Sequence, residues 1–81
     1  MKGYKFVSVE FTEDPNVAGR TYWYLCEFDT ADIGSRVTAP IGSHNRLQTA
    51  VVRRVMYAEA PYAPYPLSTI KKIEGILAEN L

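Results

Sequence analysis

Residues 20–28 read RTYWYLCEF, residues 29–35 read DTADIGS, and residues 36–40 read RVTAP. Aromatic and β-branched side chains suit a pleated, half-buried surface, whereas Gly, Asp and Ser allow the backbone to reverse. The stretch therefore predicts a strand, a turn and a second strand, paired as a hairpin. We expect Gly34 to supply the positive φ that the turn needs.

The first strand of this hairpin is apolar on both of its faces. One face carries Tyr22, Tyr24, Cys26 and Phe28, and the other carries Trp23 and Leu25. Two explanations are open: a helix or tail covers the outer face, or one aromatic face stays free as a contact surface. Small domains usually need their large apolar groups inside, which favours coverage.

Two further stretches have the alternating pattern of strands. In residues 5–11, Val7, Val9 and Phe11 share one face, and residues 12–19 then form a polar loop that contains Pro and Gly. Residues 47–57 show the longest alternation, and the short polar loop of residues 42–46 should join them to residues 36–40 as a second hairpin. These features predict a mainly β fold, a small four-stranded antiparallel barrel-like sheet.

The last quarter of the chain changes character. Prolines at 61, 64 and 66 alternate with Tyr62 and Tyr65, which predicts an extended connector lying over the barrel. Ser68 can cap a short C-terminal helix over about residues 67–80. Its apolar stripe consists of Ile70, Ile73, Leu77 and Leu81, with Ile76 beside it.

The length of 81 residues predicts one domain, residues 1–81. The single cysteine, Cys26, lies in an apolar strand, where a small buried side chain fits best. A reducing cytoplasm is the expected compartment, because the first residues lack a secretory signal and the longest apolar run is too short to cross a bilayer.

The composition argues against an enzyme and against a metal or other cofactor. The chain has one His and one Cys, whereas a zinc site needs about four N or S ligands. Ser43 and His44 are adjacent, so in an extended chain they point in different directions and do not form a nucleophile and its base. Asp29 and Asp32 are explained by turn chemistry.

The net charge is zero, but residues 33–58 hold four arginines and no acid. These could follow a nucleic-acid backbone while an exposed Tyr or Trp stacks on a base. The candidate nucleic-acid-binding residues are Arg36, Arg46, Arg53, Arg54, His44, Tyr22 and Tyr24. Alternatively, the arginines only solvate the outer faces of two strands and pair with the acids of the first third of the chain, which the neutral net charge favours. Arg53 and Arg54 are neighbours, so they serve one patch only if a bulge lies between them.

The order of turn and strand residues also resembles a known family. The segments are YWY at 22–24, IGSRVTAP at 33–40, Gly42, Arg46, and AVV at 50–52. They are similar to the start of the primosomal replication-restart helicase, primosomal protein N-prime, and to short stand-alone bacterial proteins with the same pattern. The resemblance covers residues 20–55. It implies a small β domain that binds the 3′ end of a DNA strand.

Two functions follow from these observations. The first is a non-catalytic module that binds single-stranded DNA or a DNA end, with an affinity that falls steeply with salt. The second is a protein-interaction or self-assembly module, in which Ile70, Ile73 and Leu77 and the connector tyrosines bind a partner or a second copy. No membrane partner is expected.

Overall fold

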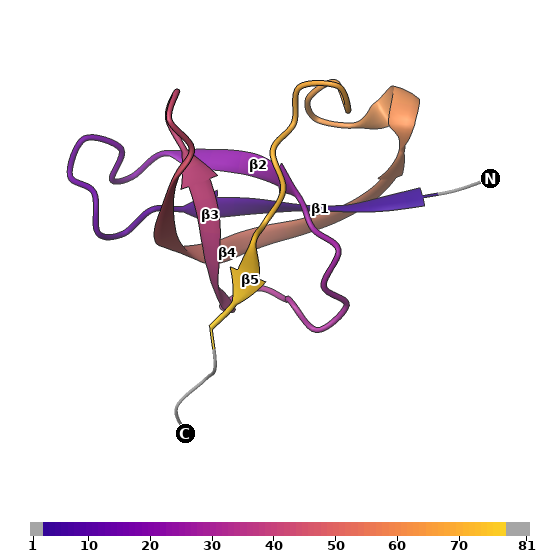
Figure 1. The fold of residues 1–81 in the computed structure, drawn as a ribbon. Helices are drawn as coiled ribbons and strands as arrows, with labels where there is room; N and C mark the ends of the chain where they lie inside the picture. Colours follow the sequence, from indigo (N-terminus) through magenta and orange to yellow (C-terminus); the bar gives the residue numbers. More distant parts are fainter. Residues whose placement is uncertain (1–2, 78–81) are drawn as a thin grey trace.

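The computed structural model describes residues 3–77, which form one antiparallel sheet of five strands in the order β2-β1-β4-β3-β5 (Figure 1). A 3₁₀ turn, η1 (Ala60–Tyr62), follows the fourth strand. The strands are β1 (Gly3–Glu10), β2 (Thr21–Leu25), β3 (Arg36–Ile41), β4 (Arg46–Glu59) and β5 (Gly75–Ile76). The predicted mainly β class is confirmed.

The core lies on one face of the curved sheet. Val7 and Val9 lie on the core face, as the alternation of residues 5–11 predicts. Pairing of β1 with β2 sets Val7 opposite Tyr24 and Val9 opposite Tyr22. The buried cluster also takes side chains from β3, β4 and the loops, including Phe11, Cys26, Val37, Ala50 and Val52. Cys26 is therefore a buried, free thiol in the core, as expected.

The long strand β4 holds the two parts of the sheet together. Its first half pairs with β3 in the predicted hairpin, and its second half pairs with β1. The ladder with β1 shifts register between Ser8 and Val9, so Arg53 is left without a partner residue. Such a bulge bends a strand and increases its twist, which lets one strand serve both parts.

The predicted hairpin of residues 20–40 is wrong in its pairing. β2 pairs with β1, and β3 pairs with β4 and β5, so β2 and β3 lie apart. The turn between them is as expected, with φ of +92° at Gly34. The buried side chain of Lys5 stabilises the beginning of this turn. Its ammonium group donates to the backbone carbonyl oxygens of Phe28, Asp29 and Ala31.

The predicted four-stranded barrel is also corrected. The sheet has five strands and is not closed between β2 and β3. The C-terminal segment crosses part of this gap. It pairs with β3 through β5 and meets β2 at one parallel bridge, between Leu25 and Lys72.

The predicted helix over residues 67–80 is contradicted in the part that the structure describes, residues 67–77. These residues make one turn, in which the Ile70 N–H donates to the Pro66 oxygen, and then run extended into β5. Residues 78–80 lie outside the described part. β-Branched residues and Gly75 favour a helix little, and the free edges of β2 and β3 offer backbone partners instead. Within residues 3–77, no helix has the length and apolar character that crossing a membrane requires.

The outer face of the sheet is covered at one end. Phe6 points away from the core, opposite Leu25 and Met56, and yet it is fully buried. Figure 1 shows the chain turning at η1 and folding back toward β2. The expected coverage of the outer face is thus found around Phe6, while Trp23, farther along, stays half-buried.

Candidate nucleic-acid interface

The fold spreads the four arginines over the molecule. All four are exposed. Arg36 begins β3, whereas Arg46 begins β4 at the other end of the hairpin. Arg53 lies in the bulge and forms an ion pair with Glu10, with 3.0 Å between Nε and Oε1. Arg54 lies on the outer face of the sheet. The arginines therefore do not form the single patch that their spacing in the sequence suggested.

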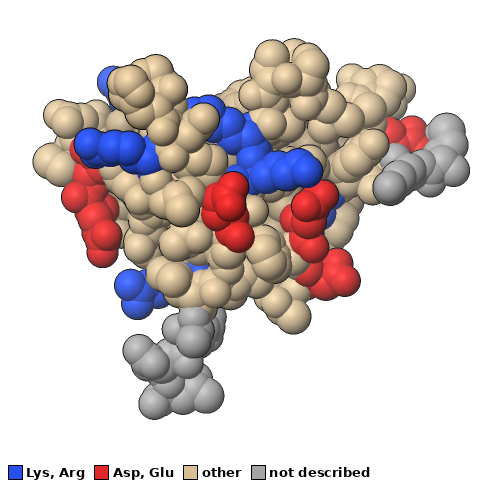
Figure 2. Space-filling view, viewed as in Figure 1, with Lys and Arg blue, Asp and Glu red and all other residues tan. Residues whose placement is uncertain are grey.

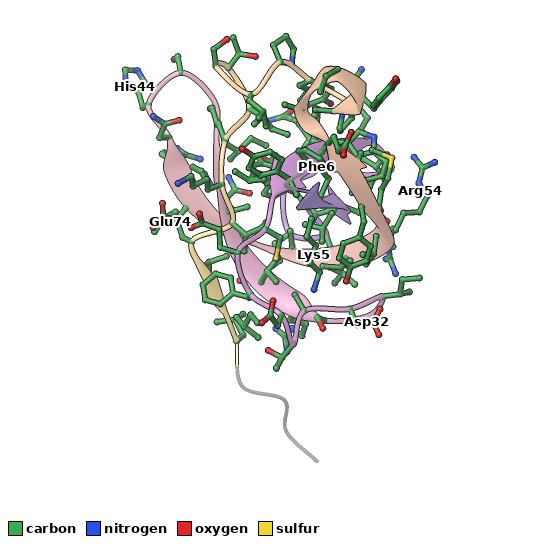
Figure 3. The ribbon with its side chains drawn as sticks, turned by 90° about the vertical axis from the view of Figure 1, so that its right-hand side faces the viewer. Lys5, Phe6, Asp32, His44, Arg54 and Glu74 are labelled. Carbon is green, nitrogen blue, oxygen red and sulfur yellow. The ribbon has the colours of Figure 1, made fainter. Side chains whose placement is uncertain are left out.

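The predicted nucleic-acid-binding residues His44 and Arg54 lie far apart on the surface. His44 is exposed in the β3–β4 turn, and Figure 3 shows it on the opposite side of the molecule from Arg54. On the face seen in Figure 2, basic and acidic side chains lie next to one another. This face therefore has no continuous basic surface for a nucleic-acid backbone.

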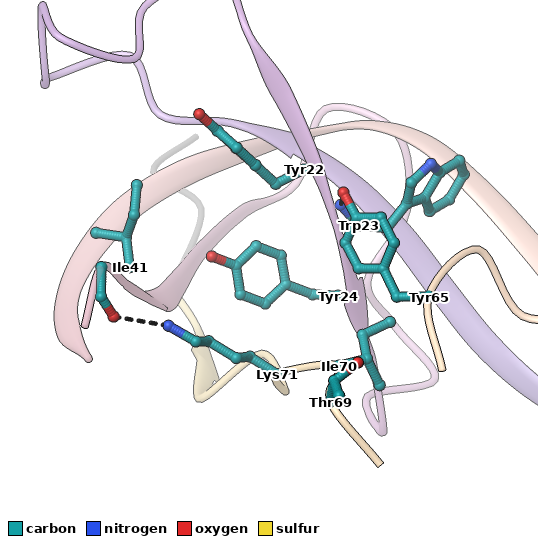
Figure 4. Close-up of a pocket in the computed structure, with 9 residues that line it drawn as sticks. Tyr22, Trp23, Tyr24, Ile41, Tyr65, Thr69, Ile70 and Lys71 are labelled. Atoms are coloured by element: carbon teal, nitrogen blue, oxygen red, sulfur yellow. Dashed lines mark hydrogen bonds between the residues drawn. The ribbon is translucent and has the colours of Figure 1, made fainter. Parts of the chain in front are cut away.

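The structure has an aromatic pocket in the open part of the gap between β2 and β3. Its volume is about 230 Å³ (Figure 4). Strand β2, the end of β3 and the connector each contribute to its wall. The lining residues are Tyr22, Trp23, Tyr24, Ile41, Gly42, Tyr65, Thr69, Ile70 and Lys71. The aromatic pocket is the natural candidate site, because it gathers large flat side chains beside one cation.

Side-chain hydrogen bonds cross the gap where no strand fills it. The Tyr24 hydroxyl donates to the Pro40 oxygen at 2.6 Å, and Lys71 Nζ donates to the Gly42 oxygen at 2.8 Å. On the connector side, the backbone N–H of Trp23 donates to the side-chain hydroxyl of Tyr65 at 3.4 Å. These bonds fix the two sides of the pocket relative to each other.

The two tyrosines predicted from the sequence have different roles in this pocket. Tyr22 is half-buried and presents part of its ring, whereas Tyr24 is only 5% exposed. Burial raises the pKa of Tyr24 to about 12, and its interactions with Tyr22 and Tyr65 add to that rise. Tyr24 is therefore a neutral hydroxyl in the floor of the pocket, and it is too buried to stack on a ligand from outside.

The apolar stripe proposed for partner binding does not exist as one surface. Ile73 is 5% exposed and belongs to the core, Ile70 lines the aromatic pocket, and Leu77 is partly buried beyond β5. Of the connector tyrosines, Tyr62 is 75% exposed, while Tyr65 covers the pocket. The helical spacing was misleading because the segment is extended, so its isoleucines point in different directions.

Sequence reasoning missed several residues of the pocket. The sequence pattern places Tyr65 in a connector and Lys71 in a helix, and it indicates no role for Ile41. Gly42 has a φ of +80° and Pro40 ends the β3 edge, and both belong to the segment that carries the family resemblance. That clustering of special backbone residues was the available signal.

Within residues 3–77, no three His, Cys, Asp or Glu side chains gather closely enough to hold a metal ion. Asp32 accepts a hydrogen bond from the Ile33 N–H at 2.7 Å, which agrees with the predicted turn chemistry. A comparison of the chain with family models, curated proteins and solved structures finds no match.

Proposed function

We propose that the protein is a non-catalytic module that binds single-stranded DNA by taking the base at a strand end into the aromatic pocket. The observation that carries this proposal is the pocket itself, whose wall includes three tyrosines, Trp23 and one lysine. None of the described lining residues is acidic. An uncharged ring and a nearby phosphate therefore fit the site better than a cation does.

The size of the pocket favours one base. A volume of about 230 Å³ lies below the roughly 300–1,000 Å³ that is usual for drug-sized ligands. Stacking on an aromatic side chain contributes about 1–3 kcal/mol per base. Tyr65 and Tyr22 are accessible enough to stack, and Lys71 at the rim can attract the adjoining phosphate.

The floor of the pocket favours a strand end over the middle of a strand. We take buried Tyr24, which donates to Pro40, as the floor of the pocket, because a strand that runs through the pocket would have to displace it. A terminal nucleotide needs an entrance on one side only. The family resemblance of residues 20–55 supports the 3′ end as that terminus.

A purely binding role agrees with the chemistry of the lining. Its hydroxyl groups have partners within the protein: Tyr24 donates to Pro40, and the Thr69 hydroxyl donates to the Pro66 oxygen at 3.0 Å. Because the pKa of Tyr24 is raised to about 12, its hydroxyl stays protonated near neutral pH and supplies no phenolate that could act as a base. The described lining offers no activated nucleophile.

Two connector tyrosines give a matched test of the pocket. Tyr65→Ala removes an accessible aromatic wall, and we expect the affinity for a fluorescein-labelled dT8 to fall about tenfold or more. Tyr62→Ala removes an exposed tyrosine outside the pocket and should leave the affinity within twofold. Fluorescence polarisation at low and moderate salt measures both. Equal affinities of the two variants would contradict the assignment of the pocket.

The strand end is tested with the unaltered protein. A linear dT8 with a free 3′ hydroxyl should compete with the labelled DNA better than the same oligonucleotide carrying a 3′ phosphate, and a circular single strand should compete least. If the circle competes as well as the linear strand, the protein does not recognise an end.

A further inference from the structure

A second feature lies on the outer face, on the other side of β2 from the pocket floor. Pairing sets Trp23 opposite Ser8 on β1, and Ser8 opposite Arg54 on β4, so these side chains form one row across three strands. The Arg54 guanidinium carbon lies 5.3 Å from the centre of the Trp23 ring. Figure 4 shows the indole directed away from Tyr22 and Tyr24.

The bulge in β4 creates this row. In a regular ladder continuing from the pair of Val52 and Val9, Arg53 would face Ser8 and Arg54 would face Val7, in the core. The extra residue shifts the register by one, so Arg54 takes the place opposite Ser8. Both arginines thereby stay out of the core and remain exposed. A bulge at these residues is the condition under which the sequence allows them to serve one patch.

The two arginines differ in their charge partners. Arg53 is neutralised by Glu10 at 3.0 Å. Arg54 has no carboxylate within salt-bridge distance among the residues that the structure describes. The guanidinium of Arg54 makes a cation–π contact with the indole of Trp23 on one side, and its N–H donors remain available to an anion.

Ser8 adds a polar group under this pair. Its side chain is fully buried, and its hydroxyl has no hydrogen-bond partner in the structure. A buried hydroxyl without a partner destabilises the fold, because it has lost its hydrogen bonds to water. An oxygen ligand that draws Arg54 outward would open the row and give this hydroxyl an acceptor.

We propose that Trp23 and Arg54 form a second contact for the same DNA strand, at which Arg54 binds a backbone phosphate farther along the strand than the one that adjoins the nucleotide in the pocket. This inference rests on the proposed function. Trp23 connects the two contacts, because it is one of the residues that line the pocket and its indole lies against the Arg54 guanidinium. A strand that leaves the pocket over the edge of β2 therefore reaches Arg54 directly.

The test compares two arginines and two lengths of DNA. Arg54→Gln and Arg36→Gln each remove one exposed charge, but Arg36 begins β3, at the opposite end from the residues that line the pocket. Labelled dT2 and dT8 are titrated against each variant at two salt concentrations. Thermal unfolding of each variant checks that the fold is retained.

We expect Arg54→Gln to weaken dT8 binding about tenfold and to lower the salt slope by about one, since one phosphate contact is lost. Binding of dT2, whose single phosphate adjoins the nucleotide in the pocket, should change less than twofold. Arg36→Gln should change dT8 binding less than threefold.

Several outcomes would overturn the inference. Equal losses in the two variants would show general charge attraction, and equal losses for dT2 and dT8 would place Arg54 in the pocket. If an acidic peptide binds to the row of Trp23, Ser8 and Arg54 more tightly than dT8 does, this surface binds a protein partner and not DNA. Failure of the proposed function looks different: the unaltered protein then binds neither oligonucleotide, or Tyr65→Ala leaves dT8 binding unchanged.

Discussion

The gap between β2 and β3 has two halves, and the chain fills them in different ways. In the closed half, the C-terminal segment makes backbone bonds of 2.9 Å to both sides: Ile73 donates to Leu25, and Glu74 donates to Thr38. In the open half, only side chains span the gap, and the aromatic pocket remains. One half therefore stabilises the fold, and the other half is available to a ligand.

Pro40 explains where the closed half stops. Arg36 and Thr38 accept bonds from the C-terminal segment through their carbonyl oxygens, so alternation places the backbone groups of Pro40 on the same edge. Proline has no N–H to continue that ladder. The Pro40 oxygen instead accepts the Tyr24 hydroxyl, and the space next to it becomes the pocket.

The largest effect should come from the closed half. Ile73→Ala deletes a side chain that is 5% exposed, and we expect it to lower the free energy of unfolding by about 2–4 kcal/mol. Ile70→Ala, in the wall of the open half, should cost less than half as much, because its side chain is already partly exposed. Urea unfolding followed by Trp23 fluorescence measures both. Equal losses would remove the distinction between the halves.

The boundary between the halves is tested at Tyr24. Tyr24→Phe removes the bond to Pro40 and should lower the free energy of unfolding by about 1 kcal/mol at pH 7. A phenol has a pKa of about 10 when unfolded, whereas that of Tyr24 is raised to about 12 in the folded protein. The folded state therefore favours the neutral phenol.

The stabilisation that this raised pKa provides is complete below pH 10 and is lost as the pH rises toward 12. Its slope is at most about 1.4 kcal/mol per pH unit. Urea unfolding between pH 9 and pH 11.5 should show a smaller loss of stability for Tyr24→Phe than for the unaltered protein. Parallel curves would mean that Tyr24 ionises as freely as a solvent-exposed tyrosine.

The smallest effect on stability should come from the rim of the open half. Lys71→Gln removes the bond to the Gly42 oxygen, yet it should change the free energy of unfolding by less than about 0.5 kcal/mol, because that bond is exposed. Binding of dT8 should nevertheless weaken several-fold. Lys72→Gln, whose native lysine pairs with Glu27 at 3.5 Å, is the matched control and should bind as before. A large loss of stability in Lys71→Gln would mean that the rim supports the fold.

Local pattern was sufficient for much of the fold. Alternating side chains predicted the strands around Val7 and Val51, and the short polar loop predicted the β3–β4 hairpin. Gly34 and Cys26 behave as their residue types suggested, one with a positive φ and one buried in the core. These outcomes depend on neighbours in the sequence, so the sequence alone could indicate them.

Long-range pairing misled the prediction in two places. Residues 20–40 have the pattern of a hairpin, but β2 finds its partner in β1, which precedes it in the chain. The isoleucines after Ser68 have helical spacing, but the free edges of β2 and β3 draw the segment into an extended form. In both cases, backbone groups supplied from elsewhere in the chain outweighed the local preference.

By itself, the sequence determined a small, mainly β fold, its core face and its turns, because these follow from side-chain period and backbone preference. Only the tertiary structure decided which strands are neighbours, where the sheet stays open, and that Tyr65 and Lys71 meet Tyr22 in one pocket. It also decided, through one bulge, that Arg54 lies over Trp23. The physical reason is that these features depend on contacts between residues far apart in the chain, which no local pattern encodes.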